Sequence, residues 1–417
     1  RRVLFRSPES VRKVFQNEGK MPERDILRCV AEYRRRNPQV YKSAGVVVEN
    51  GKVWSELRSQ LQPVMMRLAD LNPYLPSVDS IAIEFRESLA DSRDGDKVTL
   101  SFFDQASNWA LESVCSISLD THLGCLKKNL DKDSEAYKLV SCTKVFLESI
   151  SKLETTIPLY KLYDTSNWRT FSKAQKVVED IGQKHLTEIE KSGATGTEGR
   201  QYFMKTLGLD YYASIVLLLD MLIAGIDTTA SSLTFYVYNL ATNPDYQEQL
   251  YQEIKQVLPD ENSPITYNEI HQLHLLKAGL RETHRLYPSF NILFRKLPTD
   301  LVLDGYLVPE GTVCLLAMGA TSRLEEYFKD ADKFRPERWL RGRSDLPKSD
   351  RYGSLPFGHG ARMCLGKNIA EVEIWMAVIR ILQKYRLEYH GEAPKAISHT
   401  VLVPDRPLYF NFIDRNK

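Results

Sequence analysis

Apolar residues recur at every third or fourth position through most of the first two thirds of the chain, which is the spacing of helices with one buried face. The segment 7–19 opens on Ser-Pro and closes on Gly, residues that typically start and stop a helix. The same pattern predicts further helices at 53–71, 77–92, 103–123, 135–152, 167–191 and 271–288. A longer apolar segment, 211–242, ends at Asn243-Pro244 and would form a helix about 48 Å long.

The pattern changes after Pro288, where short runs of β-branched and aromatic residues alternate with Pro and Gly. These runs predict strands at 291–297, 300–308 and 312–318, one more helix at 367–385, and terminal strands near 400–404 and 408–412. The stretch 191–201, rich in Gly and Thr, is typical of a flexible loop. No linker divides the chain, so we predict a mainly α fold with a smaller β-rich part (α+β), forming one domain over residues 1–417.

The composition places the chain among ordinary folded proteins, with 43% hydrophobic and 26% charged residues. A net charge of only +2 provides no overall field for nucleic acid, so recognition of a charged partner would require a local patch. The six cysteines are scattered without a Cys-x-x-Cys pair, which argues against a disulfide framework and against a structural zinc site. The apolar stretch 214–226 is too short to span a bilayer and is interrupted by Asp220.

The segment PFGHGARMCLGKN, residues 356–368, places a cysteine in a glycine-rich loop directly before a predicted helix. Its glycines have neither the spacing of a P-loop nor that of a dinucleotide-binding loop. Most buried cysteines act only as small apolar residues. Cys364, however, precedes a helix N-terminus, where backbone N–H groups and the helix dipole stabilise a thiolate. Gly360 and Gly366 would allow the backbone to approach a large planar ligand.

Two further residues of this loop suit a planar, partly anionic ligand. Phe357 can pack against its face, and Arg362 can offer charge to its rim, which together with a thiolate indicates a haem–thiolate site. The pattern Phe357-x-x-Gly360-x-Arg362-x-Cys364-x-Gly366 resembles the haem-binding signature of cytochromes P450. The resemblance implies the cytochrome P450 fold, haem b (iron protoporphyrin IX) as cofactor, and Cys364 as the axial ligand of the haem iron.

Trp54 and Arg58 lie one helical turn apart in NGKVWSELR, an arrangement that is common for a half-buried Trp beside a surface Arg. In cytochromes P450 a W-x-x-x-R pattern on an early helix holds a haem propionate, and the resemblance implies this role here. Arg295 and His359 resemble further propionate contacts. Several guanidinium groups facing two carboxylates would form charge-assisted hydrogen bonds.

The long apolar segment carries AGIDTT at 224–229, which puts an acid and an alcohol in a stretch too apolar for an exposed face. Asp and Thr often only cap a helix or face solvent, but a buried Asp227 requires a reason. Thr228 can donate to the carbonyl of Ala224 and loosen the helix, which makes room for dioxygen. The stretch resembles the oxygen-activation motif of cytochromes P450, which implies that Asp227 and Thr228 are catalytic and pass protons for O–O cleavage.

Glu282 and Arg285 in ETHR share one helix face, a pairing that is generally common and weak. Arg338 in FRPERW could complete a buried Glu–Arg–Arg network, whose disruption would leave an unpaired charge inside the protein. In cytochromes P450 these positions form a structural triad that supports the haem core. We therefore expect the three residues to be structural and not chemical.

The segment LLKAGLRETHRLYP, 275–288, resembles the mitochondrial-type branch of the family, whose members receive an acidic 2Fe–2S ferredoxin on basic residues of this helix. Lys277 and Arg281 lie four residues apart on one face, and Lys367 could extend the basic patch. An ordinary solvated charged face is the alternative interpretation.

Arg341 and Arg343 are further candidates for this patch, whereas Asn368 stands where a second basic residue is common in the branch. The resemblance implies a protein of the mitochondrial inner membrane, on its matrix side, with peripheral membrane contact; the endoplasmic reticulum is the alternative. The chain begins at Arg1 without a methionine or a targeting segment, so we expect a natural N-terminal segment to be missing.

These patterns predict a haem–thiolate monooxygenase that hydroxylates a hydrophobic small molecule, by resemblance one derived from a sterol or steroid, with electrons from a ferredoxin. Segments 218–224, 289–293 and 400–403 are expected to line its pocket. Three alternatives are a microsomal-type P450 using a flavoprotein reductase on lipids or xenobiotics, a haem–thiolate isomerase or dehydratase, and a haem sensor without turnover. The intact Asp227–Thr228 pair argues against the isomerase, and a docking patch argues against the sensor.

Overall fold

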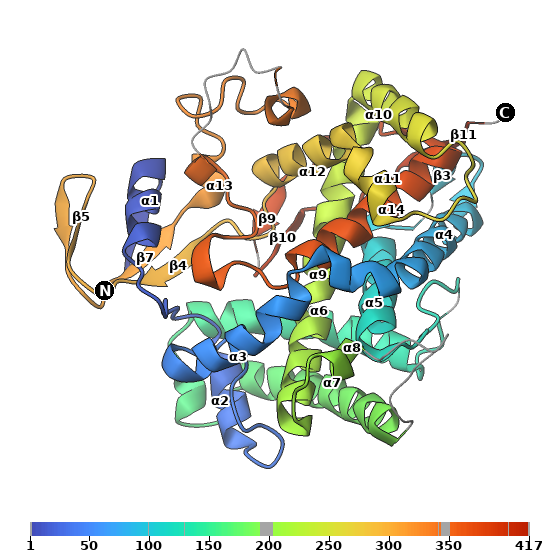
Figure 1. Cartoon of the computed structure of the whole chain (residues 1–417). Coiled ribbons are helices and arrows are strands. Elements are labelled where there is room, and N and C mark those ends of the chain that lie inside the picture. The colour runs from blue at the N-terminus through green and yellow to red at the C-terminus, as the bar shows by residue number, and fades with distance from the viewer. Residues whose placement is uncertain are drawn as a thin grey trace.

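The computed structural model describes residues 2–98, 100–128, 130–191, 203–340, 342, 351–398 and 400–415. Helices fill most of the molecule, and the long helix α9 (Tyr211–Thr242) runs through its middle (Figure 1). One small sheet lies with α1 at the side of the molecule drawn at the left of Figure 1. This arrangement confirms the predicted mainly helical α+β fold.

The secondary structure follows in chain order. The other helices are α1 (Pro8–Gln16), α2 (Arg28–Arg36), α3 (Gly51–Met65), α4 (Leu75–Asp91), α5 (Phe102–Leu119), α6 (Glu135–Thr155), α7 (Ser166–Lys191), α8 (Phe203–Thr206), α10 (Pro244–Val257), α11 (Tyr267–Gln272), α12 (His274–Leu286), α13 (Met318–Thr321) and α14 (Lys367–Lys384). Short 3₁₀ helices are η1 (Leu68–Tyr74), η2 (Leu159–Lys161), η4 (Pro336–Trp339), η5 (Arg351–Gly353) and η6 (Gly360–Arg362). The strands are β1 (Arg2–Phe5), β2 (Arg93–Asp94), β3 (Lys97–Val98), β4 (Leu293–Lys296), β5 (Leu301–Leu303), β6 (Tyr306–Val308), β7 (Val313–Leu316), β8 (Tyr385–Glu388), β9 (Ala396–Ser398), β10 (Leu402–Pro404) and β11 (Asn411–Asp414).

The strands form small sheets that join distant parts of the chain. β7 lies between β1, to which it is parallel, and β4, to which it is antiparallel. A second sheet has the order β2-β3-β11-β8, and β9 pairs with β10. In the β5–β6 hairpin, Asp304 and Gly305 have φ of 48° and 84°, as a tight two-residue turn requires. The Asp304 carboxylate also accepts hydrogen bonds from Ser7 and Ser10, which anchors α1 to the hairpin.

The helix α9 is the centre of the main hydrophobic core, because α5, α7, α12 and α14 all pack against it. Leu218, Leu222 and Leu233 are fully buried along its length. A Cβ at Gly225 would come within 2.8 Å of the Val114 side chain, so this glycine permits close approach of α5. By length and hydropathy α9 could cross a membrane, but its mostly buried surface is that of a core helix.

Asp220, the charge that interrupts the apolar sequence of α9, pairs with an arginine from a distant helix. Its Oδ1 accepts from Arg34 Nη2 of α2 over 2.6 Å, and the arginine side chain is only 1% exposed. Arg34 Nη1 donates to the carbonyl of Ala44 over 2.6 Å. The ion pair offsets part of the hydration that the carboxylate loses, although burial still raises the pKa of Asp220.

Some boundaries differ from those that the apolar spacing predicts. The segment 103–123 stays helical only to Leu119, because Asp120 adopts a left-handed conformation (φ 51°) that stops the helix. Strand β11 begins at Asn411 and not at 408, since it pairs with β8 from that residue onward. The spacing does not predict α2, whose sequence RCVAEYRRR has few apolar residues. The expected loop at 191–201 lies, apart from Lys191, outside the described residues.

The Glu282–Arg285–Arg338 group is assembled where α12 meets η4. Glu282 accepts from Arg285 Nη2 over 2.8 Å and from Arg338 Nε over 3.0 Å, with Glu282 and Arg285 completely buried. The indole N–H of Trp339 donates to the same carboxylate over 2.8 Å. Arg285 also donates to the carbonyls of Ser322 and Ala331. One carboxylate thus ties α12 to η4, a segment that follows it by more than fifty residues.

Glu282→Gln removes the only charge in this group that compensates Arg285 and Arg338, so we expect the free energy of unfolding to fall by about 3–5 kcal/mol. Chemical denaturation followed by circular dichroism measures this loss. Glu337→Gln in the same 3₁₀ turn is the control, because Glu337 is 41% exposed in its pair with Arg335 and its removal should cost under about 1 kcal/mol. Equal losses in the two variants would show that the buried network is not what stabilises this region.

Candidate active site

The loop before α14 holds Cys364 through its own backbone. The Cys364 N–H donates to the carbonyl of Phe357 over 2.9 Å. Gly358 and Gly360 have φ of 75° and 72°, a region that favours glycine. A Cβ at Gly360 would also collide with the Glu18 carboxylate. The structure therefore gives a packing reason for Gly360, where the sequence suggested close approach of a ligand.

The Cys364 side chain keeps accessible surface, although protein surrounds it closely enough for burial to raise the pKa of its thiol. Both observations hold when the sulfur faces a confined internal space. The Gly366 backbone N–H and the charges of Arg58 and Arg24 act in the opposite direction and favour the thiolate. A Cβ placed on Gly366 would meet no atom within 4 Å, so the backbone is open at this residue, two positions after the cysteine.

Arg362 is buried against Trp54, with its guanidinium carbon 3.9 Å from the centre of the indole ring. Its Nε donates to the Pro22 carbonyl over 2.8 Å and its Nη2 to Asn50 Oδ1 over 2.7 Å. Its Nη1 is buried and has no partner among the described residues. A charged donor without an acceptor is costly, which points to an anionic group that completes this site.

Arg58 and Arg295 also reach the cysteine loop. Arg58 Nη1 donates to the Met363 carbonyl over 2.7 Å. Arg295 on β4 pairs with Glu18 and donates from Nη2 to the His359 carbonyl over 3.2 Å. Sequence reasoning thus found Arg58 and Arg295 near the loop, and in this structure each of them donates one hydrogen bond to a backbone carbonyl of the loop.

The His359 ring lies between two aromatic rings. It packs edge-on against Phe15 and Tyr352, with ring centres 5.4 and 5.2 Å apart. Its backbone carbonyl accepts a hydrogen bond from Arg295. These contacts fix the start of η6.

Four guanidinium groups are close enough to influence one another, those of Arg24, Arg58, Arg295 and Arg362. Burial, followed by repulsion from the neighbouring arginines, lowers the pKa of Arg24 and of Arg362 to about 9. Glu18 is the carboxylate that the pKa shifts of both residues identify as compensating. The cluster therefore carries an excess of three positive charges, apart from any contribution of Cys364.

Thr228 on α9 uses its hydroxyl within the helix, where Oγ1 donates to the Ala224 carbonyl over 2.5 Å. Its own carbonyl accepts from Ser232 Oγ over 2.8 Å and from Ser289 Oγ over 3.4 Å. Side-chain hydroxyls that bond helix carbonyls in this way weaken and bend the helix. Ala224 is exposed although it lies in the middle of a core helix, so this turn borders an internal space.

Asp227, next to Thr228, is a partly buried acid with charged neighbours on α5 and α6. Burial raises the pKa of Asp227 to about 6; Lys144 lowers it, while Asp104 and Glu148 raise it further. A carboxyl group with this pKa can both take up and release a proton near neutral pH.

Two of the three segments expected to line a substrate pocket, 289–293 and 400–403, meet beside α9, C-terminal to the third segment, 218–224. Ser231 Oγ donates to the Leu402 carbonyl over 2.5 Å, and Leu402 N–H donates to the Ser289 carbonyl over 2.9 Å. Thr400 Oγ1 donates to the Leu147 carbonyl on α6 over 3.1 Å. The C-terminal hairpin, the segment after α12 and α9 therefore lie side by side.

The expected docking residues lie along α12 and α14. Lys277 is half-buried, donates to the His271 carbonyl over 3.1 Å and lies above the Trp375 ring. Arg281 is exposed. Lys367 lies 3.7 Å from Glu371, and Lys367, Arg281 and Lys277 each lower the burial-raised pKa of this carboxyl. The basic patch therefore surrounds one acid that the sequence did not single out.

Two other expectations for this patch have different outcomes. Arg341 and Arg343 lie outside the described residues. Asn368 is buried and donates from Nδ2 to the Met66 carbonyl over 2.8 Å, so it does not belong to the exposed surface.

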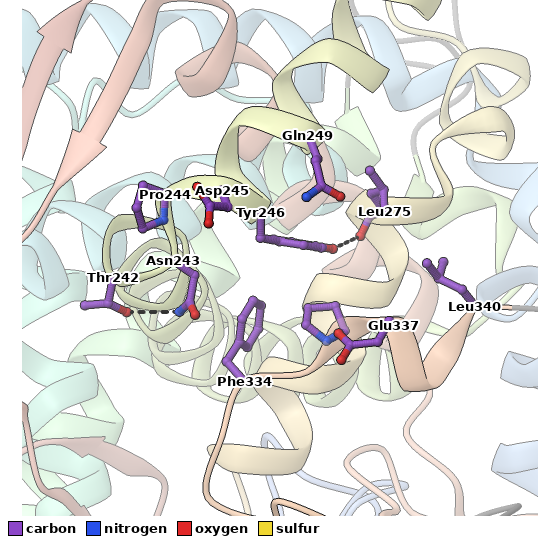
Figure 2. Close-up of a pocket in the computed structure, with 11 residues that line it drawn as sticks. Thr242, Asn243, Pro244, Asp245, Tyr246, Gln249, Leu275, Phe334, Glu337 and Leu340 are labelled. Carbon is purple, nitrogen blue, oxygen red and sulfur yellow. Dashed lines mark hydrogen bonds between the residues drawn. The ribbon is translucent and has the colours of Figure 1, made fainter. Parts of the chain in front are cut away.

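A hollow of about 330 Å³ elsewhere on the molecule is not part of this site. Figure 2 shows it between the start of α10, the start of α12 and η4, with Tyr246 donating to the Leu275 carbonyl across it. Asp245 and Glu337 give it an acidic lining. None of the residues that surround Cys364 lines this hollow.

Comparison with known proteins agrees with this geometry. The sequence model of the family described as "Cytochrome P450" matches residues 1–412. The chain belongs to the cytochrome P450 family. It is 31% identical to "Probable cytochrome P450 301a1, mitochondrial" of Drosophila melanogaster, covering 96% of this chain and 75% of the relative. It is 32% identical to "Probable cytochrome P450 12a5, mitochondrial" of the same species (99% and 81%) and 30% identical to "Cytochrome P450 12b1, mitochondrial" of Drosophila acanthoptera (98% and 79%).

Cytochromes P450 hold haem b, and three features of this P450 fit that group. The buried Nη1 of Arg362 has no acceptor, and the backbone at Gly366 borders open space beside Cys364. The arginine cluster exceeds Glu18 by three positive charges. The two haem propionates and a thiolate would bring three negative charges, of which the net positive charge of a ferric porphyrin cancels one. Among the described residues no three His, Cys, Asp or Glu side chains gather as an alternative metal site.

Sequence reasoning missed Arg24 and Glu18, which belong to the loops around α1 and α2. Arg24 lies near Arg295 and Arg58, and Glu18 pairs with Arg295. Neither residue falls in a recognisable local pattern, and only the fold brings them to the cysteine loop.

We expect Asp227→Asn to stabilise the protein above pH 6. In the folded state Asp227 holds its proton up to about pH 6, but in the unfolded chain only to about pH 4, so stability falls as pH rises between these values. The asparagine variant lacks this loss. Its free energy of unfolding should exceed that of the natural protein by about 1–3 kcal/mol at pH 7.5, and by less at pH 5.

Denaturant unfolding of the holoprotein at both pH values measures the difference. Asp210→Asn on the same helix is the control, because Asp210 is an exposed N-cap residue and asparagine caps equally well. A pH-independent difference for Asp227→Asn would contradict the raised pKa.

Proposed function

We propose that this P450 hydroxylates a hydrophobic, sterol- or steroid-derived substrate with electrons from an acidic 2Fe–2S ferredoxin. In the overall reaction the substrate C–H bond becomes C–OH, one oxygen atom of O2 enters the product, and two electrons and two protons reduce the other atom to water. The observation that carries the proposal is Cys364, which keeps accessible surface beside a cluster of four arginines that has Glu18 as its compensating carboxylate. All of residues 1–417 would serve this one catalytic unit.

The proposed residue roles follow from the contacts around the loop. Cys364 would be the axial ligand of the haem iron, and a bound haem with thiolate ligation supplies the activation and cleavage of dioxygen. Arg362, with its free Nη1, would hold a propionate, and Trp54 would keep that guanidinium in place. Arg58 and Arg295 would add positive charge to the same side of the site.

The other loop residues would shape the haem site. Phe357 would pack on the porphyrin face from the cysteine side, and the two glycines Gly360 and Gly366 would keep the loop tight and the space beside the cysteine open. His359 would contribute through its backbone contact with Arg295.

Asp227 and Thr228 would supply protons on the opposite side of the site. The pKa of about 6 allows the Asp227 carboxylate to collect a proton from the polar groups on α5 and α6 and to release it again. Thr228 holds its hydroxyl proton on the Ala224 carbonyl, from which it can turn towards the site. The intact acid–alcohol pair favours a monooxygenase over an isomerase or dehydratase.

Two observations support the donor. The relatives named above carry "mitochondrial" in their names, and the mitochondrial-type branch uses ferredoxin. Arg281 is exposed beside the half-buried Lys277 and Lys367, which gives the face of α12 and α14 a positive charge suited to an acidic partner. A flavoprotein-dependent, microsomal-type enzyme is the second candidate.

The proposed location is the matrix side of the mitochondrial inner membrane, with peripheral contact to the bilayer; the endoplasmic reticulum is the alternative. The connection between α6 and α7 supports the contact, because Ile157 and Leu162 are 78% and 82% exposed. Tyr163 and Leu159 extend this apolar tip, and Lys161 lies among them. Exposed apolar side chains of this kind, clustered in one turn, suit shallow insertion into lipid.

The carbon monoxide difference spectrum of the dithionite-reduced protein tests the thiolate. We expect a strongly red-shifted Soret band for the natural protein and its loss in Cys364→Ala. Cys142→Ala on α6, a partly buried cysteine away from the loop, is the control and should leave the spectrum unchanged. An unchanged spectrum for Cys364→Ala would falsify the assigned ligand.

Reconstituted turnover with a panel of sterols and steroids tests the donor and the substrate. We expect product with an acidic 2Fe–2S ferredoxin and its reductase, and not with a microsomal flavoprotein reductase. Arg281→Glu should raise the KM for ferredoxin about tenfold at low salt, and by less at high salt, because a rim charge mainly steers association. The control Lys138→Glu changes an equally exposed residue of α6 and should leave KM unaltered. Product with the flavoprotein alone would support the second candidate.

A further inference from the structure

The signature segment of α12 contains a histidine whose environment links the two sides of the site. His284 lies between Glu282 and Arg285 in sequence, but its ring points to other partners. It is 3% exposed, and its Nε2 lies 3.0 Å from Ser232 Oγ on α9. Its ring packs edge-on against Phe357 of the cysteine loop, with centres 5.2 Å apart and planes at 87°. One imidazole therefore contacts both α9 and the loop of Cys364.

The neighbouring hydrogen bonds decide which way the protons point. A backbone carbonyl can only accept, so Ser232 must direct its single hydroxyl proton to the Thr228 carbonyl, 2.8 Å away. Ser289, 3.2 Å from Ser232, also has the Thr228 carbonyl as an acceptor. When Ser232 donates to Thr228, its Oγ can accept from His284, and this arrangement places the imidazole proton on Nε2. Burial lowers the pKa of His284 to about 4, in agreement with a neutral ring.

This chain of hydrogen bonds ends on the turn of α9 that needs external support. The Thr228 hydroxyl bonds Ala224, and the Thr228 carbonyl is shared among side-chain hydroxyls, an arrangement that loosens the helix locally. The position of Thr228 then depends in part on two groups outside α9: Ser289, and His284 acting through Ser232 of α9.

We propose that His284 is a positioning residue that clamps the Thr228 turn of α9 to the cysteine loop, through Ser232 on one side and Phe357 on the other. The role rests on the proposed function, in which Thr228 donates a proton beside the haem. An apolar side chain such as leucine would fill the same space and pack on Phe357, but it would leave Ser232 without its donor. The hydrogen bond, and not the bulk of the ring, is therefore the property to test.

The test compares His284→Leu with His284→Gln, because the amide nitrogen of glutamine can donate from nearly the same position as Nε2. In the holoprotein we expect His284→Leu to raise hydrogen–deuterium exchange in the 228–232 turn about tenfold, as the loss of one buried hydrogen bond implies. Under turnover the same variant should divert several-fold more electrons to hydrogen peroxide, at an unchanged carbon monoxide spectrum. His284→Gln should restore both quantities most of the way.

Ser232→Ala provides a second route if His284→Leu fails to fold, and it should raise exchange and peroxide in the same way. The double variant with His284→Leu should show little more exchange or peroxide than either single variant, because both substitutions remove the same hydrogen bond. His185→Leu is the matched control, since His185 is also buried but pairs with Glu135 between α7 and α6. It should lower stability without changing exchange at 228–232 or the yield of peroxide.

Two results would overturn the clamp. If His284→Leu and His284→Gln both behave as the natural protein, His284 only fills space; if both are equally impaired, its ring shape matters and not its hydrogen bond. The exchange measurement needs no electron donor or substrate. Increased exchange in a protein that no donor can turn over would therefore refute the proposed function and leave the clamp supported.

Discussion

Buried positive charge is the constraint on which the site of this P450 depends. Arg24, Arg58, Arg295 and Arg362 come from four separate segments and share a poorly hydrated space, with Glu18 as their compensating carboxylate. Burying like charges together is costly unless anions accompany them. If Cys364 and the arginines hold haem as proposed, its propionates would lower the repulsion that the protein alone leaves in place, and folding of this region would be coupled to binding of the cofactor.

Helix α12 connects the cysteine loop to other parts of the molecule, because neighbouring residues on this helix face different partners. Glu282 and Arg285 face the segment that leads to the cysteine loop and bind its backbone and Arg338. His284, between them, faces α9 and Phe357. One short helix thus fixes both the loop that carries the thiolate and the turn that carries the acid and the alcohol. Its exposed side carries Arg281, so three of the proposed roles, docking of a partner, support of the cysteine loop and proton delivery, would depend on this one helix.

Local sequence patterns found the parts of the site that local chemistry defines. The cysteine loop needs Gly358 and Gly360 at positive φ and a helix directly after it, so its residues must be contiguous. The pair of Asp227 and Thr228 likewise needs adjacent positions on a long apolar helix. Arg24 and Glu18 do not have to occupy particular positions next to other residues of the site. Each only has to place one charge near Arg295, and many sequence positions could do so.

The sequence by itself determined the helical fold, the thiolate loop and the family, because apolar periodicity and contiguous motifs are properties of short segments. Only the tertiary structure determines which partner each buried polar or charged side chain contacts. In the folded protein Asp220 pairs with Arg34, Arg58 and Arg295 donate to the backbone of the cysteine loop, and Asn368 is buried. The reason is physical: the free energy of a buried charge or hydrogen bond depends on the partners that folding brings near it, and these partners lie hundreds of residues away along the chain.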